Sequence, residues 1–516
     1  MYLVYITFPE VFHHLPFWRT DGVILTALLH VGPVEFLYYW LHRALHHHFL
    51  YSRYHSHHHS SIVTQPITSV IHPFAEIVAY FVIFLIPISA TIFTRTTSMA
   101  SLFGYILYID FMNNLGHCNF EFFPKNLFSL FPLFKYLCYT PSFHSLHHTK
   151  FRTNYCLFMP IYDYIYNTMD ESSDDTYEIS LKRPKDLPDV VHLTHLTTLD
   201  SIYHLPYGFS SLASNPQTSN WYLRLMWPFT FVIKIILAWI HGRTFISERN
   251  TFEKLNLQSW VVPRFTNQYF LKWQSTRLNK IIGEAILEAN SSGVKVLSLG
   301  LLNQREELNA YGELYIQKFP KLKVKIVDGS SLAAAIVVNS IPKGTSQVLL
   351  RGNFNNVFFA IAKALCEANV QVAMLHQDEF TKLQLRLNTK ARESSALSTI
   401  ASSKIWLVGD GWNEDEQMKA LKGSLFIPFS QFPPKKMRKD CFYHYTPSMR
   451  APPSIKNMHS CENWLPRRAM SAGRIAGIVH ALEGWNVHEC GSTTFCLHQI
   501  WDATIRHGFQ TLHTPS

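Results

Sequence analysis

The chain has 516 residues, of which 47% are hydrophobic and 14% aromatic, so it can form more than one domain. Its formal charge of +10 is spread along the sequence rather than gathered in blocks, which argues against a nucleic-acid-binding protein. The eight cysteines form no C-x-x-C pair, so neither a thiolate zinc site nor a disulfide framework is expected. The first residues lack the basic region and cleavage site of a secretory signal, so nothing indicates export.

Apolar segments cluster before residue 241. The clearest, Phe74–Phe93, is long enough to cross a bilayer and contains one charged residue, Glu76. Charged residues, glycine or proline interrupt three weaker candidates, which are Val23–Trp40, Leu102–Met112 and Met226–Ile240. The alternative, that all four are core helices of a soluble protein, leaves their clustering unexplained. The pattern therefore predicts an α-helical membrane domain, with the basic residues beside it at a cytosolic surface.

Histidines are concentrated between two of these segments. Eight of the eighteen residues from His42 to His59 are histidine, whereas an even spread of 28 in 516 predicts about one. In the H-x-x-x-H motif of His42 and His46, both imidazoles lie on one face of a helix. Two H-x-x-H-H motifs follow, at 55–59 and 144–148. One zinc ion is satisfied by three or four ligands, so eight or more imidazoles predict two metal ions, and imidazole suits iron, zinc and copper.

An isolated H-x-x-x-H is more often a surface or core feature than a site, but three such motifs in this order are typical of a metal centre. His117 follows the Leu102–Met112 segment and is added to the ligands, whereas His72 is a weaker candidate. His47, His48 and His57 depart from the shared spacing and are expected to lie outside the ligand set. No other catalytic or cofactor-binding residue is predicted, and the predicted metal ligands are His42, His46, His55, His58, His59, His117, His144, His147 and His148.

The texture of the sequence changes after residue 280, where short β-rich runs alternate with helical patterns. The runs are Val294–Leu299, Val324–Asp328, Val348–Arg351, Val370–Leu375 and Ile405–Gly409. This alternation predicts a doubly wound, Rossmann-like parallel sheet. Residues 169–220 are polar and rich in Asp, Ser and Pro, which is typical of an exposed connection. We therefore expect a membrane-embedded domain at 1–170, a connection with a further apolar segment at 171–280, and a soluble α/β domain at 281–516.

The segment Leu350–Val357 lies between a predicted strand and the predicted helix Val357–Ala368, where nucleotide-binding folds place their phosphate loop. Only Gly352 is present, because Phe354 and Val357 stand where the second and third glycines of G-x-G-x-x-G would fall. The loop therefore favours a structural or partner-binding role over dinucleotide binding. The late helix Arg467–Glu483 mixes Ala and Gly with apolar residues, and we expect it to serve in packing.

The three histidine motifs between apolar segments resemble the fatty acid hydroxylase superfamily, which includes sterol desaturases and sterol methyl oxidases. Longer stretches are similar to the eceriferum-type aldehyde decarbonylases of plant cuticular wax synthesis. Among them are YSRYHSHHHSSIVTQPITSVIHPFAE, VHLTHLTTLDSIYHL, KVLSLGLLNQREELN, LFIPFSQFP and HSCENWLPRRAMSAGRIAGIVHALEGW. The resemblance covers nearly the whole chain.

This resemblance implies a multi-pass enzyme of the endoplasmic reticulum membrane, with the histidine motifs and the C-terminal domain facing the cytosol. Its cofactors would be two iron ions and dioxygen, with electrons from a cytochrome b5/NADPH system. It would convert very-long-chain aldehydes into alkanes one carbon shorter, beside a sister subunit that supplies the aldehyde. Two alternatives stay open: a fatty acid or sterol hydroxylase or desaturase of the same superfamily, and a non-catalytic or truncated subunit of the alkane-forming complex. Family members begin further upstream with additional hydrophobic segments, so we expect a truncated product, an alternative start or a divergent paralogue.

Overall fold

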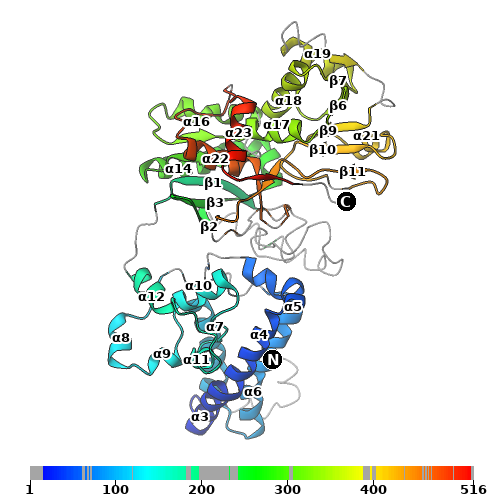
Figure 1. The fold of residues 1–516 in the computed structure, drawn as a ribbon. Helices are drawn as coiled ribbons and strands as arrows, with labels where there is room; N and C mark the ends of the chain where they lie inside the picture. Colours follow the sequence, from blue (N-terminus) through cyan, green and yellow to red (C-terminus); the bar gives the residue numbers. More distant parts are fainter. Residues whose placement is uncertain are drawn as a thin grey trace. The chain divides into compact units, whose positions relative to one another are not determined.

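A computed structural model describes most of the chain (Figure 1). The described residues are 15–60, 64, 66, 69, 72–118, 120–181, 187–196, 232, 242–300, 306–386, 395–397, 403–434, 436–455, 458, 462, 464–466, 468–491 and 493–512. The chain divides into two compact units, Met1–Lys185 and Asp186–Ser516, and each is treated by itself below.

The described part of the first unit is helical. Its longest helix runs from Thr20 to Leu45 and consists of α3 (Thr20–Leu29), the π-helical segment η1 (His30–Val34) and α4 (Glu35–Leu45). Pro33 lies inside η1. Because proline lacks an N–H and its ring crowds the preceding turn, the wider π turn is where a continuous helix can accept it.

Within the part of the chain that the structure describes, two helices are long and apolar enough to cross a membrane: Thr20–Leu45, and α6 (Phe74–Phe93), which has the bounds expected from the sequence. Both present large apolar side chains outward, among them Leu28 and Val82. The weaker candidate Leu102–Met112 forms part of η4 (Ala100–Gly104) and α7 (Tyr105–Gly116). The candidate at 226–240 lies outside the described residues, apart from position 232.

Shorter helices complete the first unit. They are α5 (His48–Arg53), the 3₁₀ segment η2 (His55–Ser60), α8 (Lys125–Leu130), α9 (Phe134–Leu137), α10 (Pro141–Lys150), α11 (Ile161–Ile165) and α12 (Ser173–Leu181). Helix α10 begins sharply because the Thr140 hydroxyl accepts a hydrogen bond from the Phe143 N–H at 3.2 Å and Pro141 occupies the first turn. It ends at Phe151, whose backbone is left-handed. This short helix carries the third histidine motif.

The described residues of the second unit form three sheets. The first, in the order β2-β3-β1-β4-β5, is built from β1 (Val190–Leu196), β2 (Phe245–Phe252), β3 (Leu255–Phe265), β4 (Val296–Ser298) and β5 (Lys325–Val327), and only the β2–β3 pairing is antiparallel. The second, in the order β11-β10-β9-β6-β7-β8, is parallel throughout. Its strands are β6 (Gln347–Arg351), β7 (Gln371–Met374), β8 (Ser395–Leu397), β9 (Ile405–Val408), β10 (Leu425–Pro428) and β11 (Phe442–Tyr443). The third joins β12 (Ser448–Arg450) to β13 (Ala469–Ser471) and β14 (Gln510–Thr511) in antiparallel pairs.

The five runs predicted as strands form β4, β5, β6, β7 and β9, which confirms an α/β unit with parallel sheets. They are divided between two sheets, however, where the sequence suggested one. The predicted connection 171–280 also differs from the structure, because β1, β2 and β3 lie within it and β1 pairs with both β3 and β4. Pairing between strands so far apart in the chain leaves no local sequence signature, so the sequence analysis did not detect it. The structure divides the two units after Lys185.

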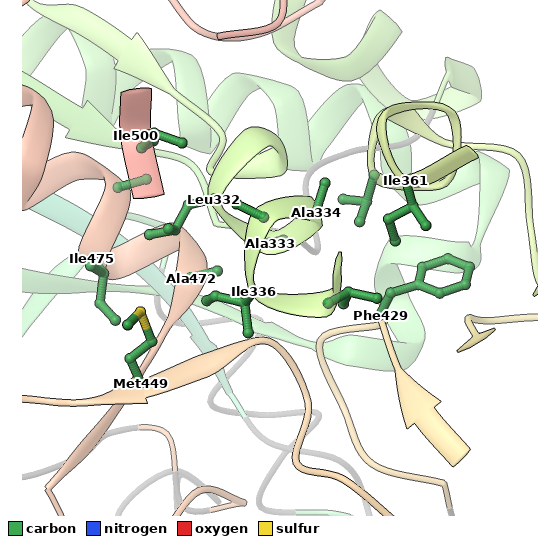
Figure 2. Packing of buried hydrophobic residues seen from close by; sticks show 14 of the residues in the cluster. Leu332, Ala333, Ala334, Ile336, Ile361, Phe429, Met449, Ala472, Ile475 and Ile500 are labelled. Carbon is green, nitrogen blue, oxygen red and sulfur yellow. The ribbon is translucent and has the colours of Figure 1, made fainter. Parts of the chain in front are cut away.

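Helix α17 (Ser330–Asn339) lies in the main hydrophobic core of this unit. Figure 2 shows its residues Leu332, Ala333 and Ile336 surrounded by apolar side chains from other elements. Those elements include α18 (Asn356–Glu367), α22 (Ala472–Glu483) and α23 (Leu497–Arg506). Small alanine side chains let these helices approach closely and fill the core. Helix α22 is buried from Ala472 to His480, in keeping with the packing role expected for this segment. The other helices are α14 (Ser275–Ser291), α15 (Glu306–Asn309), α16 (Glu313–Lys318), α19 (Gln377–Arg386) and α21 (Glu414–Met418).

The loop between β6 and α18 has the predicted strand–loop–helix context, but its glycine faces another strand. A Cβ on Gly352 would lie 2.8 Å from the Cα of Gly409, at the end of β9. The ring of Phe354 packs on those of Phe358 and Phe359, with centroids 4.7 and 5.5 Å apart. The phenylalanine of the loop thus packs on the first turn of α18, and its glycine approaches the end of β9.

Candidate metal centre

The nine predicted ligands come from four helical segments of the first unit, and all nine are buried. The first motif ends α4, the second lies in η2, and the third lies in α10. His117 directly follows α7. In the first and third motifs, histidines four residues apart share one face of an α-helical segment, as the sequence indicated. The second motif differs from that expectation, because it lies in a 3₁₀ segment.

The structure brings these histidines into two groups. The first contains His42, His46, His55, His59 and His147; the second contains His58, His117, His144 and His148. In each group, one ring nitrogen per residue lies within 4.8 Å of the others. In the first group, Nε2 of His55 is 3.0 Å from Nε2 of His42 and 3.1 Å from Nε2 of His59. The groups adjoin, since the ring centroids of His59 and His148 are 4.5 Å apart.

Each H-x-x-H-H motif serves both groups. His55 and His59, four residues apart, belong to the first group, while His58 between them belongs to the second. The third motif does the reverse: its outer residues join the second group, and His147 joins the first. Adjacent side chains point about 100° apart on an α-helix and about 120° apart on a 3₁₀ helix, so the paired histidines at the end of each motif could reach two neighbouring metal positions.

Hydrogen bonds at Nδ1 fix several of these rings. Nδ1 of His42 is 2.9 Å from the Tyr155 carbonyl oxygen, and Nδ1 of His147 is 2.7 Å from that of Thr153. Nδ1 of His117 is 3.0 Å from the Asn113 carbonyl oxygen. A carbonyl only accepts, so each Nδ1 carries the proton and each Nε2 presents a lone pair toward its group. This arrangement is typical of histidines that bind metals.

The opposite nitrogens fit a cation. Among the described residues of the two groups, the buried Nε2 atoms of His46, His117, His144 and His147 have no hydrogen-bond partner. Buried polar atoms are rarely left unpaired, because their desolvation is costly. Neutral imidazole donors converging in two sets match the preferences of iron, zinc or copper, so these residues could hold two metal ions.

Comparisons with known proteins agree with both halves of the structure. Residues 27–168 match the fatty acid hydroxylase family, and residues 348–511 match the CER1-like C-terminal domain. The chain is 60% identical over 506 residues to the very-long-chain aldehyde decarbonylase CER1 of Arabidopsis thaliana, covering 97% of this chain and 81% of that protein. The chain belongs to the CER1-like family.

Other family members are equally extensive matches. The very-long-chain aldehyde decarbonylase GL1-5 of Oryza sativa subsp. indica is 58% identical over 96% of this chain and 80% of its own length. Solved structures add no argument about the fold. An NAD-dependent malic enzyme of Thermotoga maritima, for example, is 11% identical over 51% of this chain and 67% of its own, with a TM-score of 0.22.

Burial favours the neutral form of four histidines in the two groups of this CER1-like chain. It lowers the pKa of His117 and of His147 to about 3, against which their hydrogen bonds to backbone carbonyls act only in part. Burial, followed by the neighbouring imidazoles, holds the pKa of His58 and of His144 well below the ordinary value. At neutral pH the rings are therefore in the form that binds metal, and binding displaces few protons.

One buried residue beside the histidine groups escaped the sequence analysis. Glu76 forms a third cluster with His55 and His72. The available signal was its position as the single charged residue of an apolar helix, since a carboxylate buried there needs a partner. His72, the weaker candidate, lies beside this carboxylate. His47 and His48 are exposed, as expected, and the side chain of residue 57 lies outside the described part.

Proposed function

We propose that this chain is a di-iron oxidoreductase of wax synthesis that converts very-long-chain fatty aldehydes into alkanes one carbon shorter. The observation that carries the proposal is the pair of adjoining, buried histidine groups in a chain 60% identical to an aldehyde decarbonylase over nearly its full length. The nine histidines named above would be the iron ligands, five for one ion and four for the other.

The residues of the chain itself would hold the two irons and orient the ligand rings. Iron bound by neutral imidazoles supplies dioxygen activation, for which each turnover also needs external electrons. Carbonyl groups of Tyr155, Thr153 and Asn113 hold three ligand rings with Nε2 directed inward. Because the ligands are fully buried, bulk water is kept away from the donors, and the aldehyde carbonyl would be placed beside the groups.

We further propose that the enzyme works in the membrane of the endoplasmic reticulum as a multi-pass protein, with the histidine motifs and the second unit on the cytosolic side. Support comes from the two apolar helices Thr20–Leu45 and Phe74–Phe93. Transfer of a long alkyl chain from lipid into water costs about 0.8 kcal/mol of free energy per CH2, so the substrate stays in the bilayer and the enzyme has to bind it there.

The partners in this proposal are cytochrome b5, reduced through an NADPH system, and a homologous sister subunit that supplies the aldehyde. The second unit would then serve as a folded scaffold for assembly. Its β6–α18 loop is filled by aromatic side chains, which favours packing over nucleotide binding.

The test is co-expression of the chain with cytochrome b5 and the sister protein in a host that makes very-long-chain acyl-CoA, followed by gas chromatography of the lipids. Odd-chain alkanes are expected with the wild type and should vanish with His147→Ala. His48→Ala is the matched control, because His48 is exposed outside both groups, and it should retain alkane formation. Hydroxylated or desaturated lipids in place of alkanes would favour the hydroxylase alternative, and no product from stably expressed protein would favour a non-catalytic subunit.

A further inference from the structure

Glu76 is an unusual residue for its place. It is the one charged side chain of α6, in which every other residue of Phe74–Phe93 is uncharged. Its side chain is 0% exposed. An ionised carboxylate in such a position is strongly disfavoured unless several donors reach it.

Three donors do reach it, and all three reach the same oxygen. Nδ1 of His55 lies 2.7 Å from Oε1 of Glu76, and Nδ1 of His72 lies 3.0 Å from it. The hydroxyl of Tyr80 donates to the same atom at 2.6 Å. Charge-assisted hydrogen bonds of this length are about twice as strong as neutral ones, so the carboxylate is a rigid anchor for these side chains.

The contact with His55 fixes that ring chemically as well as sterically. Because the carboxylate accepts, Nδ1 of His55 carries the proton, and the lone pair of Nε2 faces the first group. Nε2 of His55 lies 3.0 Å from Nε2 of His42 and 3.1 Å from Nε2 of His59. A carboxylate behind a ligand imidazole also makes that imidazole a stronger donor.

The same carboxylate reaches toward the second group through His72. The ring of His72 stacks on that of His58, with centroids 4.2 Å apart and planes 15° apart. His72 lies between two acceptors, with Nδ1 3.0 Å from Oε1 of Glu76 and Nε2 3.1 Å from the Ser69 carbonyl oxygen, and a neutral ring donates to one of them at a time. His72 is thus held as a flat support against a histidine of the second group.

We propose that Glu76 is the positioning residue of the metal centre: it acts through His55 on the first group and, through His72, braces His58 of the second. This inference rests on the proposed function, since it presupposes metal bound by the two groups. Glu76 itself lies behind the imidazole of His55, on the side away from His42 and His59.

The test compares Glu76→Gln with the wild type in the purified full-length chain. Glu35→Gln is the matched control, because Glu35 is also a fully buried carboxylate in an apolar helix. Its oxygens accept from the Phe158 and Met159 N–H groups and approach His30 at 3.4 Å, and it belongs to neither histidine group. The readouts are iron affinity, by competition with a chelator, and the ⁵⁷Fe Mössbauer spectrum.

Glu76→Gln should lower iron affinity by about 10- to 100-fold, the effect usual for loss of an outer partner of a ligand histidine, and should change the Mössbauer signal. Glu35→Gln should leave both readouts unchanged. In a His55→Ala background, Glu76→Gln should not lower the iron affinity of the first group any further, because Glu76 acts on that group through His55. Elution of the purified protein checks that Glu76→Gln is folded. If it does not elute as the wild type does, Glu76→Asp is used instead, and it should weaken iron binding less because it keeps the carboxylate charge.

The outcomes separate the two proposals. A wild-type chain that binds no iron would overturn the proposed function. A wild-type chain that binds two irons, with Glu76→Gln equal to it in affinity and spectrum, would overturn the positioning role and leave the proposed function standing. An equal loss of iron affinity in Glu35→Gln would also overturn the positioning role, because replacing any buried carboxylate would then have the same effect.

Discussion

Neighbouring histidines of the second motif should control different metal ions. His58 belongs to the group of four and His59 to the group of five. His58→Ala leaves three imidazoles in its group, one fewer than a four-coordinate metal needs, whereas His59→Ala leaves four. Loss of a direct ligand should cost more than the roughly 10- to 100-fold of an outer partner, which is about 1.4–2.7 kcal/mol.

The assay is iron per chain, by mass spectrometry of metal in purified protein, with the exposed His48→Ala as control. The wild type should hold about two irons, His58→Ala about one, and His59→Ala an amount between these values. Loss of both irons in either variant, or the same loss in both, would refute the division of the motif between two sites.

Two further predictions concern the second unit. Gly329→Ala should lower the midpoint of thermal unfolding more than Gly344→Ala. Both glycines have φ near +80°, so both substitutions strain the backbone. Only at Gly329 would the new Cβ also overlap the backbone of Gly473, which should lower the free energy of unfolding by about 1–3 kcal/mol more. Burial, reinforced by Glu489, raises the pKa of Asp328 to about 8. Below that pH the folded state retains a proton that the unfolded state loses near its ordinary pKa, so stability should fall as pH rises toward 8. Asp328→Asn should make the midpoint of thermal unfolding depend less on pH, measured by thermal shift over a series of pH values. An unchanged pH dependence in this variant would contradict the prediction.

Local patterns made much of this protein predictable. The helix Phe74–Phe93 has the bounds read from its apolar run, because a segment of twenty residues with a single charge leaves few other folded states. The strands β4 to β7 and β9 likewise fall where β-rich runs alternate with helical patterns. Eight of the nine histidines that the structure brings together were predicted from the spacing of the three motifs, and His117 was predicted from its place after an apolar segment.

Other features depended on contacts between distant segments. Strand β1 pairs with β3 and β4, about 65 and 105 residues further along, and hydrogen bonds of this range have no local sequence signal. The loop at Gly352 has the sequence context of a phosphate loop, and only its approach to Gly409 showed that a strand occupies the space.

At the candidate metal centre, the sequence by itself predicted which histidines come together, because motif spacing is a local property of the chain. Only the tertiary structure decided that His58 and His59 face different groups, and that Glu76 stands behind His55. Those choices depend on how α4, α6, α7 and α10 pack around η2. The direction in which a side chain meets residues from other segments is set by that packing, and the spacing of residues within one segment does not determine it.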